Sequence, residues 1–258
     1  MILRLVLAFM LLSHAGKAQQ TKQANAKNTD TNPTRHISVY RQAVAGNDMN
    51  TAATALQYHL AESGINDSYA DTLAMVYLQQ SQYPQCFYWT NRRLELHPEN
   101  QILQEMKGIC LDRMGRPKEA ISIFESLFLK TRNPYHAYQL MEMQYGIKRL
   151  AECVETGRLA EQLGYKPEYR MTYSIGQQTR TTLLEAGICN IHALALFDLG
   201  DKANARKYLE KALALDSSFA LARQNLNALS SMVQAEPGKK GVVDDSNLKT
   251  QPALRIEN

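Results

Sequence analysis

Histidine and cysteine are the side chains of this protein best suited to holding a metal ion or acting as a nucleophile. The chain has six histidines and four cysteines. No histidine stands in an H-E-x-x-H pattern, and none lies at zinc-ligand spacing from a cysteine. The sequence also lacks a G-x-x-x-x-G-K-[ST] phosphate-binding loop and a G-x-S-x-G nucleophile elbow. It therefore predicts a protein that is not an enzyme and that holds no metal ion or cofactor.

The helices expected to position these side chains repeat with a period of 34 residues. In the segment 186–219, two apolar stripes at helical spacing lie on either side of Gly200-Asp201. The small residues Ala52, Cys86 and Ala120 are separated by 34 and 34 residues. A short helix cannot bury its apolar stripe alone, so each pair of helices must pack on the next pair.

This pattern resembles the tetratricopeptide repeat, a unit of helix, turn and helix about 34 residues long. In 186–219 the characteristic small and large positions of that family are occupied by Ala193, Leu196, Gly200, Ala205, Leu209 and Ala212. The family's usual Trp and Pro are replaced by Cys189 and Ser217. The resemblance implies an all-α fold, a right-handed α-solenoid of about five helical hairpins followed by a C-terminal capping helix.

The resemblance places a repeat domain at 33–232, with units at about 33–66, 67–100, 101–133, 134–163 and 186–219. Helices are expected at 34–45, 49–62, 68–79, 84–95, 101–113, 117–129, 134–146, 150–163, 181–198 and 202–214. The unit at 134–163 is irregular, because Gly157 stands where the family has a large residue. In the capping helix, 218–232, Leu221, Leu226 and Leu229 are expected to pack inward, and Gln224 and Asn225 to face solvent.

One insertion, at 164–182, interrupts the period. The equivalent small residues Cys153 and Ala205 are 52 residues apart, about 18 more than the period. Long irregular connections in compact domains are usually functional or disordered. The sequence is consistent with a tethered surface loop or with a lid or contact arm beside the groove. The candidate contact residues on this segment are Tyr165, Tyr169, Arg170 and Tyr173.

The resemblance also implies a concave surface lined by the first helix of each unit. The candidate groove residues are Met75, Gln79, Met106, Ile109, Arg113, Tyr135, Tyr138, Gln139, Glu142, Tyr145, Asn190, Leu194 and Phe197. Aromatic and Met side chains are typical of peptide-binding surfaces. Among the residues that the resemblance places on this surface, acidic side chains outnumber the single basic one, Arg113. This favours an extended or helical partner that is partly apolar and neutral to basic. In the alternative interpretation, half of these residues pack against the segment 164–182 or the capping helix.

The four cysteines each fall at a helical repeat position. Cys86 and Cys153 take the small position at which Ala is usual, and a free Cys behaves as a small hydrophobe. We therefore expect four buried free thiols, with a Cys86–Cys110 bridge as the alternative. His59 and His192 fall on packed faces and are expected to be structural.

The two ends of the chain differ in composition from its body. Residues 1–18 have a positive Arg4, an apolar run and small residues before the expected cleavage point, which predicts a cleaved signal peptide or else an uncleaved N-terminal anchor. No Cys lies near that point, so a lipoprotein is not expected. Residues 19–32 are interpreted as a flexible linker and 233–258 as a disordered tail. Of the net charge of +4, the first 32 residues contribute +3 and the tail 0, which leaves +1 for the body and gives no case for a nucleic-acid partner.

These observations predict a non-catalytic scaffold or adaptor that is exported to the periplasm or cell envelope of a bacterium. Its partner would be a protein or peptide held in the concave groove, and after signal cleavage no segment would cross a membrane. The alternative is a structural subunit of an outer-membrane or secretion assembly that uses its convex face, loop and tails. The cluster of Phe87, Tyr88 and Trp89 is the candidate convex patch. An enzyme or small-ligand carrier would need a closed apolar pocket.

Overall fold

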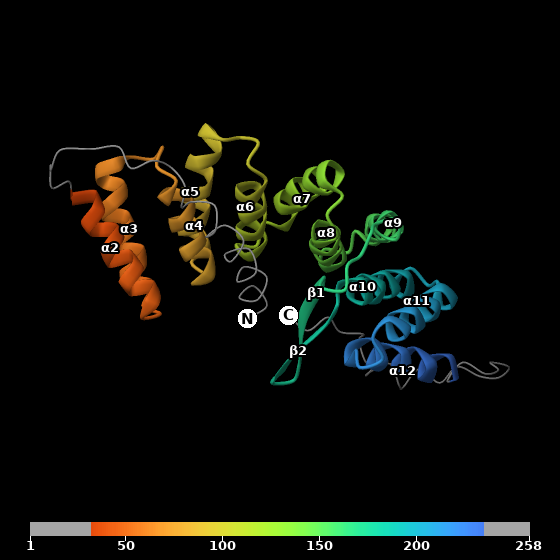
Figure 1. Ribbon diagram of the computed structural model, residues 1–258. Coiled ribbons are helices and arrows are strands. Elements are labelled where there is room, and N and C mark those ends of the chain that lie inside the picture. The colour runs from red at the N-terminus through yellow and green to blue at the C-terminus, as the bar shows by residue number, and fades with distance from the viewer. Residues whose placement is uncertain (1–31, 235–258) are drawn as a thin grey trace, which may run out of the picture. The chain divides into compact units, whose positions relative to one another are not determined.

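A computed structural model describes residues 32–234 of the chain. The expected signal peptide 1–18, the linker up to residue 31 and the tail beyond residue 234 lie outside the described residues. The chain forms two compact units, with the boundary between Leu129 and Lys130. Both are helical (Figure 1).

Unit 1, which ends at Leu129, contains three helical hairpins, apart from the last two residues of α7. Its helices are α2 (Asn32–Ala45), α3 (Met49–Ser63), α4 (Tyr69–Gln79), α5 (Tyr83–Leu96), α6 (Gln101–Arg113) and α7 (Pro117–Thr131). Consecutive helices from α2 to α6 pack on one another, and α4 also contacts α6. The sequence predicted the limits of all six helices to within two residues.

The tight turn inside each hairpin carries the same backbone motif. The second residue after the helix takes a left-handed conformation, and its N–H and the next N–H bond back to carbonyls of the last helical turn. These are the two hydrogen bonds of the Schellman motif. Glycine adopts this conformation most easily, yet only two of the five left-handed residues are glycines. The five residues are Asn47, Ser81, Gly115, Lys148 and Gly200.

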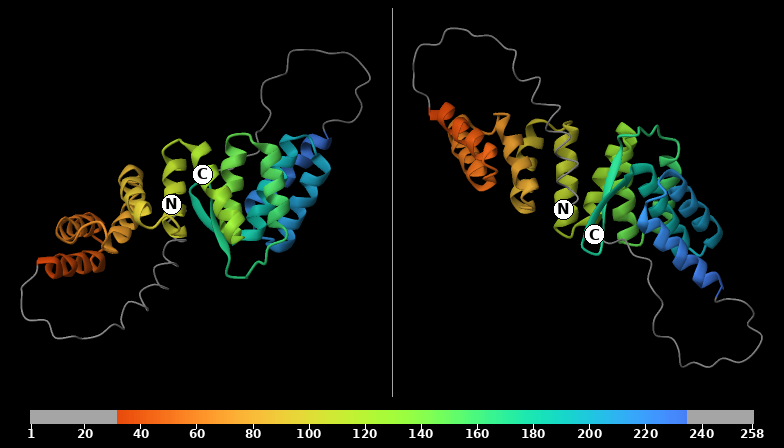
Figure 2. Two further views of the ribbon diagram at one scale, coloured as in Figure 1. Left: turned by 90° about the horizontal axis from the view of Figure 1, so that it is seen from above. Right: turned by 60° about the horizontal axis from the view of Figure 1, so that its bottom comes forward.

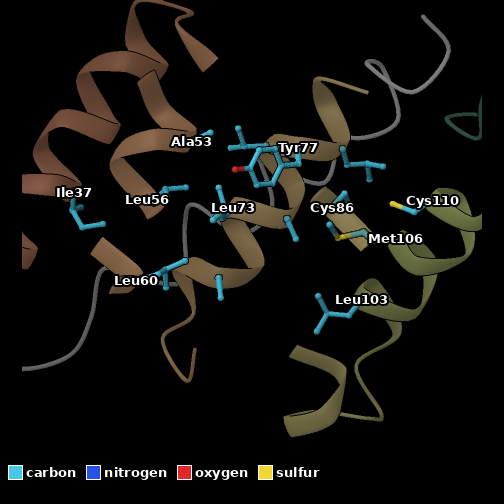
Figure 3. Packing of buried hydrophobic residues seen from close by; sticks show 14 residues of the cluster. Ile37, Ala53, Leu56, Leu60, Leu73, Tyr77, Cys86, Leu103, Met106 and Cys110 are labelled. Carbon is cyan, nitrogen blue, oxygen red and sulfur yellow. The ribbon is translucent and has the colours of Figure 1, made fainter. Parts of the chain in front are cut away.

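The core of unit 1 follows from the small residues of the repeat. Ala52, Cys86 and Ala120 are 0% exposed, as the 34-residue spacing predicts. Figure 3 shows the hydrophobic cluster to which each of the helices from α2 to α6 contributes residues. At Gly108 of α6 an added Cβ would lie 2.6 Å from the Phe124 ring of α7, so these two helices can approach only because Gly108 has no side chain.

Unit 2 contains two helical hairpins, a β-hairpin and a final helix. Its elements are α8 (Pro134–Gly146), α9 (Leu150–Ala160), β1 (Arg170–Ile175), β2 (Gln178–Leu183), α10 (Leu184–Asp198), α11 (Lys202–Leu215) and α12 (Ala220–Gln234). α10 is central. It contacts α8, α9, α11 and both strands.

The irregular position Gly157 has a structural explanation in unit 2. An added Cβ there would lie 2.7 Å from the ring nitrogen Nδ1 of His192 on α10. His192 is 3% exposed and its ring packs 4.1 Å from the ring of Tyr208 on α11. The space usually filled by a large residue of α9 is therefore filled by His192, which confirms the structural role expected for this histidine.

Two expectations for unit 2 were wrong. The segment 164–182 is not an irregular loop, because most of it forms β1 and β2, and α10 starts at Leu184 rather than 181. Asn225 of α12 does not face solvent; it is 4% exposed and its Nδ2 donates to Asn190 Oδ1 at 2.9 Å. Leu221 and Leu229 pack inward as predicted.

All four cysteines are free and buried, as expected. Burial raises the pKa of Cys153 and that of Cys189 to about 12. Because the thiolate is the reactive form, these two thiols are held in an unreactive state.

Candidate functional site

The β1–β2 hairpin is the main departure of this chain from a plain helical repeat, and it lies beside α8 and α10 (Figure 2). The strands are antiparallel, with Ile175 opposite Gln178 and Arg170 opposite Leu183. A two-residue turn joins them, and Gly176 at its first position has a φ of 55°. A type II′ hairpin turn needs positive φ there, which explains the glycine.

The inner face of the hairpin packs on the helix faces that the resemblance predicted to be concave. Met171 of β1 lies directly over Gly187 of α10, where an added Cβ would overlap the sulfur of Met171 and come within 3.4 Å of the Tyr138 ring of α8. Met171 is 8% exposed and Tyr138 is 7% exposed. The glycine therefore provides the space in which the hairpin docks.

Two tyrosines fix β1 against the helices. The Tyr135 hydroxyl of α8 accepts from the Arg170 N–H at 3.2 Å and donates to the Arg170 carbonyl at 3.3 Å. The ring of Tyr173 packs 4.9 Å from that of Phe219, and the Tyr173 hydroxyl accepts from the N–H of Ala220 at 3.3 Å. The hairpin thus bridges α8 and the start of α12.

A third contact anchors β2. The Thr182 hydroxyl donates to Oδ2 of Asp216 at 2.7 Å, and Thr182 is 0% exposed. Burial raises the pKa of the Asp216 carboxyl, but hydrogen bonds from Ser218 and Thr182 outweigh this effect, so the pKa is lowered overall. The carboxylate is therefore charged at neutral pH and holds the strand as an acceptor.

Between the hairpin and the helices lies a small pocket lined by Tyr138, Glu142, Asn190 and neighbouring apolar residues. The Tyr138 hydroxyl donates to Glu142 Oε1 at 2.7 Å, and burial together with this carboxylate raises the pKa of Tyr138 well above its ordinary value. The space open to water is about 20 Å³. That volume accommodates one water molecule and is far below that of a small-ligand site.

The structure corrects part of the predicted groove. Five candidates are buried in the packing between elements rather than lining a surface: Met106, Tyr138, Tyr145, Asn190 and Leu194. The other candidates retain partial or full exposure: Met75, Gln79, Ile109, Arg113, Tyr135, Gln139, Glu142 and Phe197. For Tyr138 and Asn190 the alternative interpretation holds, because the hairpin and the final helix cover them.

The predicted contact loop is corrected in a similar way. Tyr173 is 3% exposed, because its ring is part of the docking face. Tyr165 and Tyr169 are half-buried, and Arg170 is exposed. Sequence reasoning missed Met171, Gly187 and Thr182 as docking residues. The alternation of large and polar residues before Gly176 and the threonines after it were a signal for a β-hairpin.

In unit 1 the helices that were predicted to line the groove keep an accessible face. Met75 and Gln79 are one turn apart on α4, and Ile109 and Arg113 are one turn apart on α6. Met75 and Ile109 are partly buried against the core, whereas Arg113 is exposed. At the start of α4, the carboxylate of Asp71 is already held by the buried guanidinium of Arg93, with Nε to Oδ1 at 2.5 Å. This α4–α6 face therefore presents two apolar side chains with polar ends.

Within residues 32–234, no group of His, Cys, Asp and Glu side chains is arranged to hold a metal ion. In the same range, no helix is both long enough and apolar enough to cross a membrane.

Residues 186–219, which form α10, α11 and the turn between them, match the family model described as tetratricopeptide repeat. This segment thus has the sequence pattern of one tetratricopeptide repeat. No curated protein matches the chain. Solved tetratricopeptide-repeat proteins share its fold.

Three of these structures illustrate the likeness. The MamA protein is 14% identical with a TM-score of 0.59, over 73% of this chain and 93% of MamA. A tetratricopeptide repeat protein from Parabacteroides merdae is 11% identical with a TM-score of 0.62, over 78% and 73%. YrrB, described as a tetratricopeptide-repeat protein with an unusual peptide-binding site, is 17% identical with a TM-score of 0.55, over 74% and 90%. The chain is therefore a helical-repeat protein in fold, with a β-hairpin added before its last repeat.

Proposed function

We propose that the chain is a non-catalytic scaffold of the bacterial cell envelope that binds a protein or peptide segment on the α4–α6 face of unit 1. The observation that carries the proposal is that Met75, Gln79, Ile109 and Arg113 keep exposure on this face. In unit 2 the hairpin covers the equivalent helices. Repeat folds use such faces for binding, and YrrB, a protein of the same fold, has a peptide-binding site.

The chemistry of the face defines the partner. Met75 and Ile109 offer apolar contact, and a flexible Met adapts to different side chains. Asp112 lies beside Arg113, with 3.8 Å between Oδ2 and Nε, and burial raises the pKa of the Asp112 carboxyl. A partly apolar segment with polar or basic ends fits this surface. Placement in the envelope rests on the signal-like sequence of residues 1–18.

A photocrosslinking experiment tests the binding face. A photoreactive residue is placed at Gln79 of the mature chain, 19–258, and at Ser122 on the exposed side of α7 as the matched control. Partners are identified by mass spectrometry after irradiation in cells. The proposal expects a discrete product from position 79 and none of it from position 122.

A pair of charge variants tests the same face without the crosslinker. Gln79→Lys with Arg113→Glu changes the charge of the α4–α6 face. Lys118→Glu with Ser122→Lys makes the same types of change at exposed positions of α7. If both variants fold and both lose the partner, or neither does, the binding face is not α4–α6.

A second candidate function is supported by the surface of α5. Tyr88 is 53% exposed, and the Arg92 guanidinium lies 5.7 Å from the centre of its ring. This exposed pair of Tyr88 and Arg92 supports the alternative of an assembly subunit that uses its outer helices. Tyr88→Ala would then abolish co-purification of the assembly, while the α4–α6 variant would leave it intact.

A further inference from the structure

The outer edge of strand β2 has unpaired backbone groups, as its register shows. In a hairpin with a two-residue turn, the residues flanking the turn, here Ile175 and Gln178, exchange both hydrogen bonds. Hydrogen-bonded and non-hydrogen-bonded pairs then alternate. The N–H and C=O groups of Thr179 and Thr181 must therefore point away from β1, toward the outer edge.

Two contacts support this assignment independently. The N–H of Leu184 donates to the carbonyl of Tyr169 at 2.9 Å, which continues the hydrogen-bonded pairs beyond the strands. The hydroxyl of Tyr135 reaches both backbone groups of Arg170, which is possible only if these groups point away from β2. Arg170 of β1 and Thr179 and Thr181 of β2 belong to the same, outward-pointing set.

The two edges of the hairpin differ in exposure. On β1, Met171, Thr172 and Tyr173 are all buried, and Tyr135 occupies the outward groups at its start. On β2, the four residues 178–181 are all exposed. Among the residues that the structure describes, no hydrogen bond from outside the hairpin reaches Thr179 or Thr181.

We propose that the outer edge of β2 binds an extended, acidic segment of a partner protein by β-strand addition. Exposed N–H and C=O groups at every second residue are the arrangement that an added strand requires. The strands carry Arg170 and Arg180 and no acidic residue. Arg180 lies between the two outward-pointing threonines, so an acidic side chain on the added strand would pair with it.

A second copy of the chain fits this edge less well. Antiparallel pairing of two β2 strands around Arg180 would bring two guanidinium groups together, and like charges across a strand pair are destabilising. The proposal rests on the proposed role in protein interaction, but the surface is separate from the α4–α6 face and prefers the opposite charge.

Fluorescence anisotropy tests the proposal with the mature chain and a labelled peptide of alternating valine and glutamate. We expect saturable binding that weakens with salt, and much weaker binding of the valine–lysine peptide. Thr179→Pro removes one outward N–H and no hydrogen bond of the hairpin, as edge strands tolerate. It should weaken binding about fivefold, whereas Thr179→Ala, which keeps the N–H, should bind like the native chain.

Arg180→Glu provides a variant that does not depend on proline. It should bind the valine–lysine peptide more tightly than the valine–glutamate peptide, the reverse of the native order. Binding of the glutamate peptide that is unchanged in Thr179→Pro, or no binding by the native chain, would overturn the proposal. A dimer that Thr179→Pro dissociates in analytical ultracentrifugation would also overturn it, in favour of self-association. None of these results affects a crosslink at Gln79, so the proposed function is tested separately.

Discussion

The docking of the β-hairpin on α10 predicts an unusual response to a glycine-to-alanine change. In the interior of a helix, Gly→Ala normally stabilises by about 1 kcal/mol. At Gly187 the new Cβ would overlap the sulfur of Met171, which is buried between the hairpin and the helix. Overpacking of this kind costs about 1–3 kcal/mol. We therefore expect Gly187→Ala to destabilise the protein by up to about 2 kcal/mol despite its better helix propensity.

The size of the effect is isolated by a double-mutant cycle with Met171→Ala. Met171→Ala alone should destabilise by about 2–5 kcal/mol, because a buried Met is truncated. With the sulfur gone, Gly187→Ala should regain its ordinary stabilising effect of about 1 kcal/mol. The change of sign between the two backgrounds corresponds to an interaction of about 1–3 kcal/mol.

Urea unfolding followed by far-UV circular dichroism measures each free energy, and amide exchange of the buried Thr182, which pairs with Met171 across the hairpin, reports on the hairpin itself. In the native background, Gly187→Ala should speed that exchange, because the added Cβ displaces the hairpin from α10. If Gly187→Ala instead stabilises the native chain by about 1 kcal/mol, then the hairpin does not dock on α10 as described.

Three further predictions concern packing and pH. Gly108→Ala should lower the urea midpoint, with a net loss of about 1 kcal/mol, because the Phe124 ring must move to admit the Cβ; an unchanged or raised midpoint would contradict the close approach. Asn190→Ala should cost about 1–3 kcal/mol of unfolding free energy by leaving the Asn225 amide buried without its acceptor, and simultaneous replacement of both residues by Leu should recover much of the loss. Asp201 caps α11, and hydrogen bonds from the side chain and backbone of the first turn lower the pKa of its carboxyl. Its stabilising effect is therefore present at neutral pH and lost as the pH falls through the lowered pKa. In thermal unfolding between pH 7 and 3, Asp201→Asn should lose less stability on acidification than the native chain does.

The helices were predictable because their periodicity is a direct consequence of packing. Small residues such as Ala120 must recur where two helices meet, and the sequence records that spacing. The burial of Tyr138 and Asn190 was not predictable in the same way. The family's pattern indicates which helix face is concave, but it carries no information on what an inserted segment will cover. For Asn225, the approximate register of α12 left its face undetermined, and its partner lies 35 residues earlier in the sequence.

The left-handed turn residues show that different side chains can occupy one and the same backbone turn. Three of the five turns use Asn47, Ser81 and Lys148 in a conformation that glycine adopts more easily. Their hydrogen bonds are the same as at Gly115 and Gly200, so the packing of the two helices imposes the turn even where the residue opposes it. The turn geometry is thus the same with asparagine, serine, lysine or glycine at this position. A residue other than glycine at this position is therefore compatible with a helical hairpin of this kind.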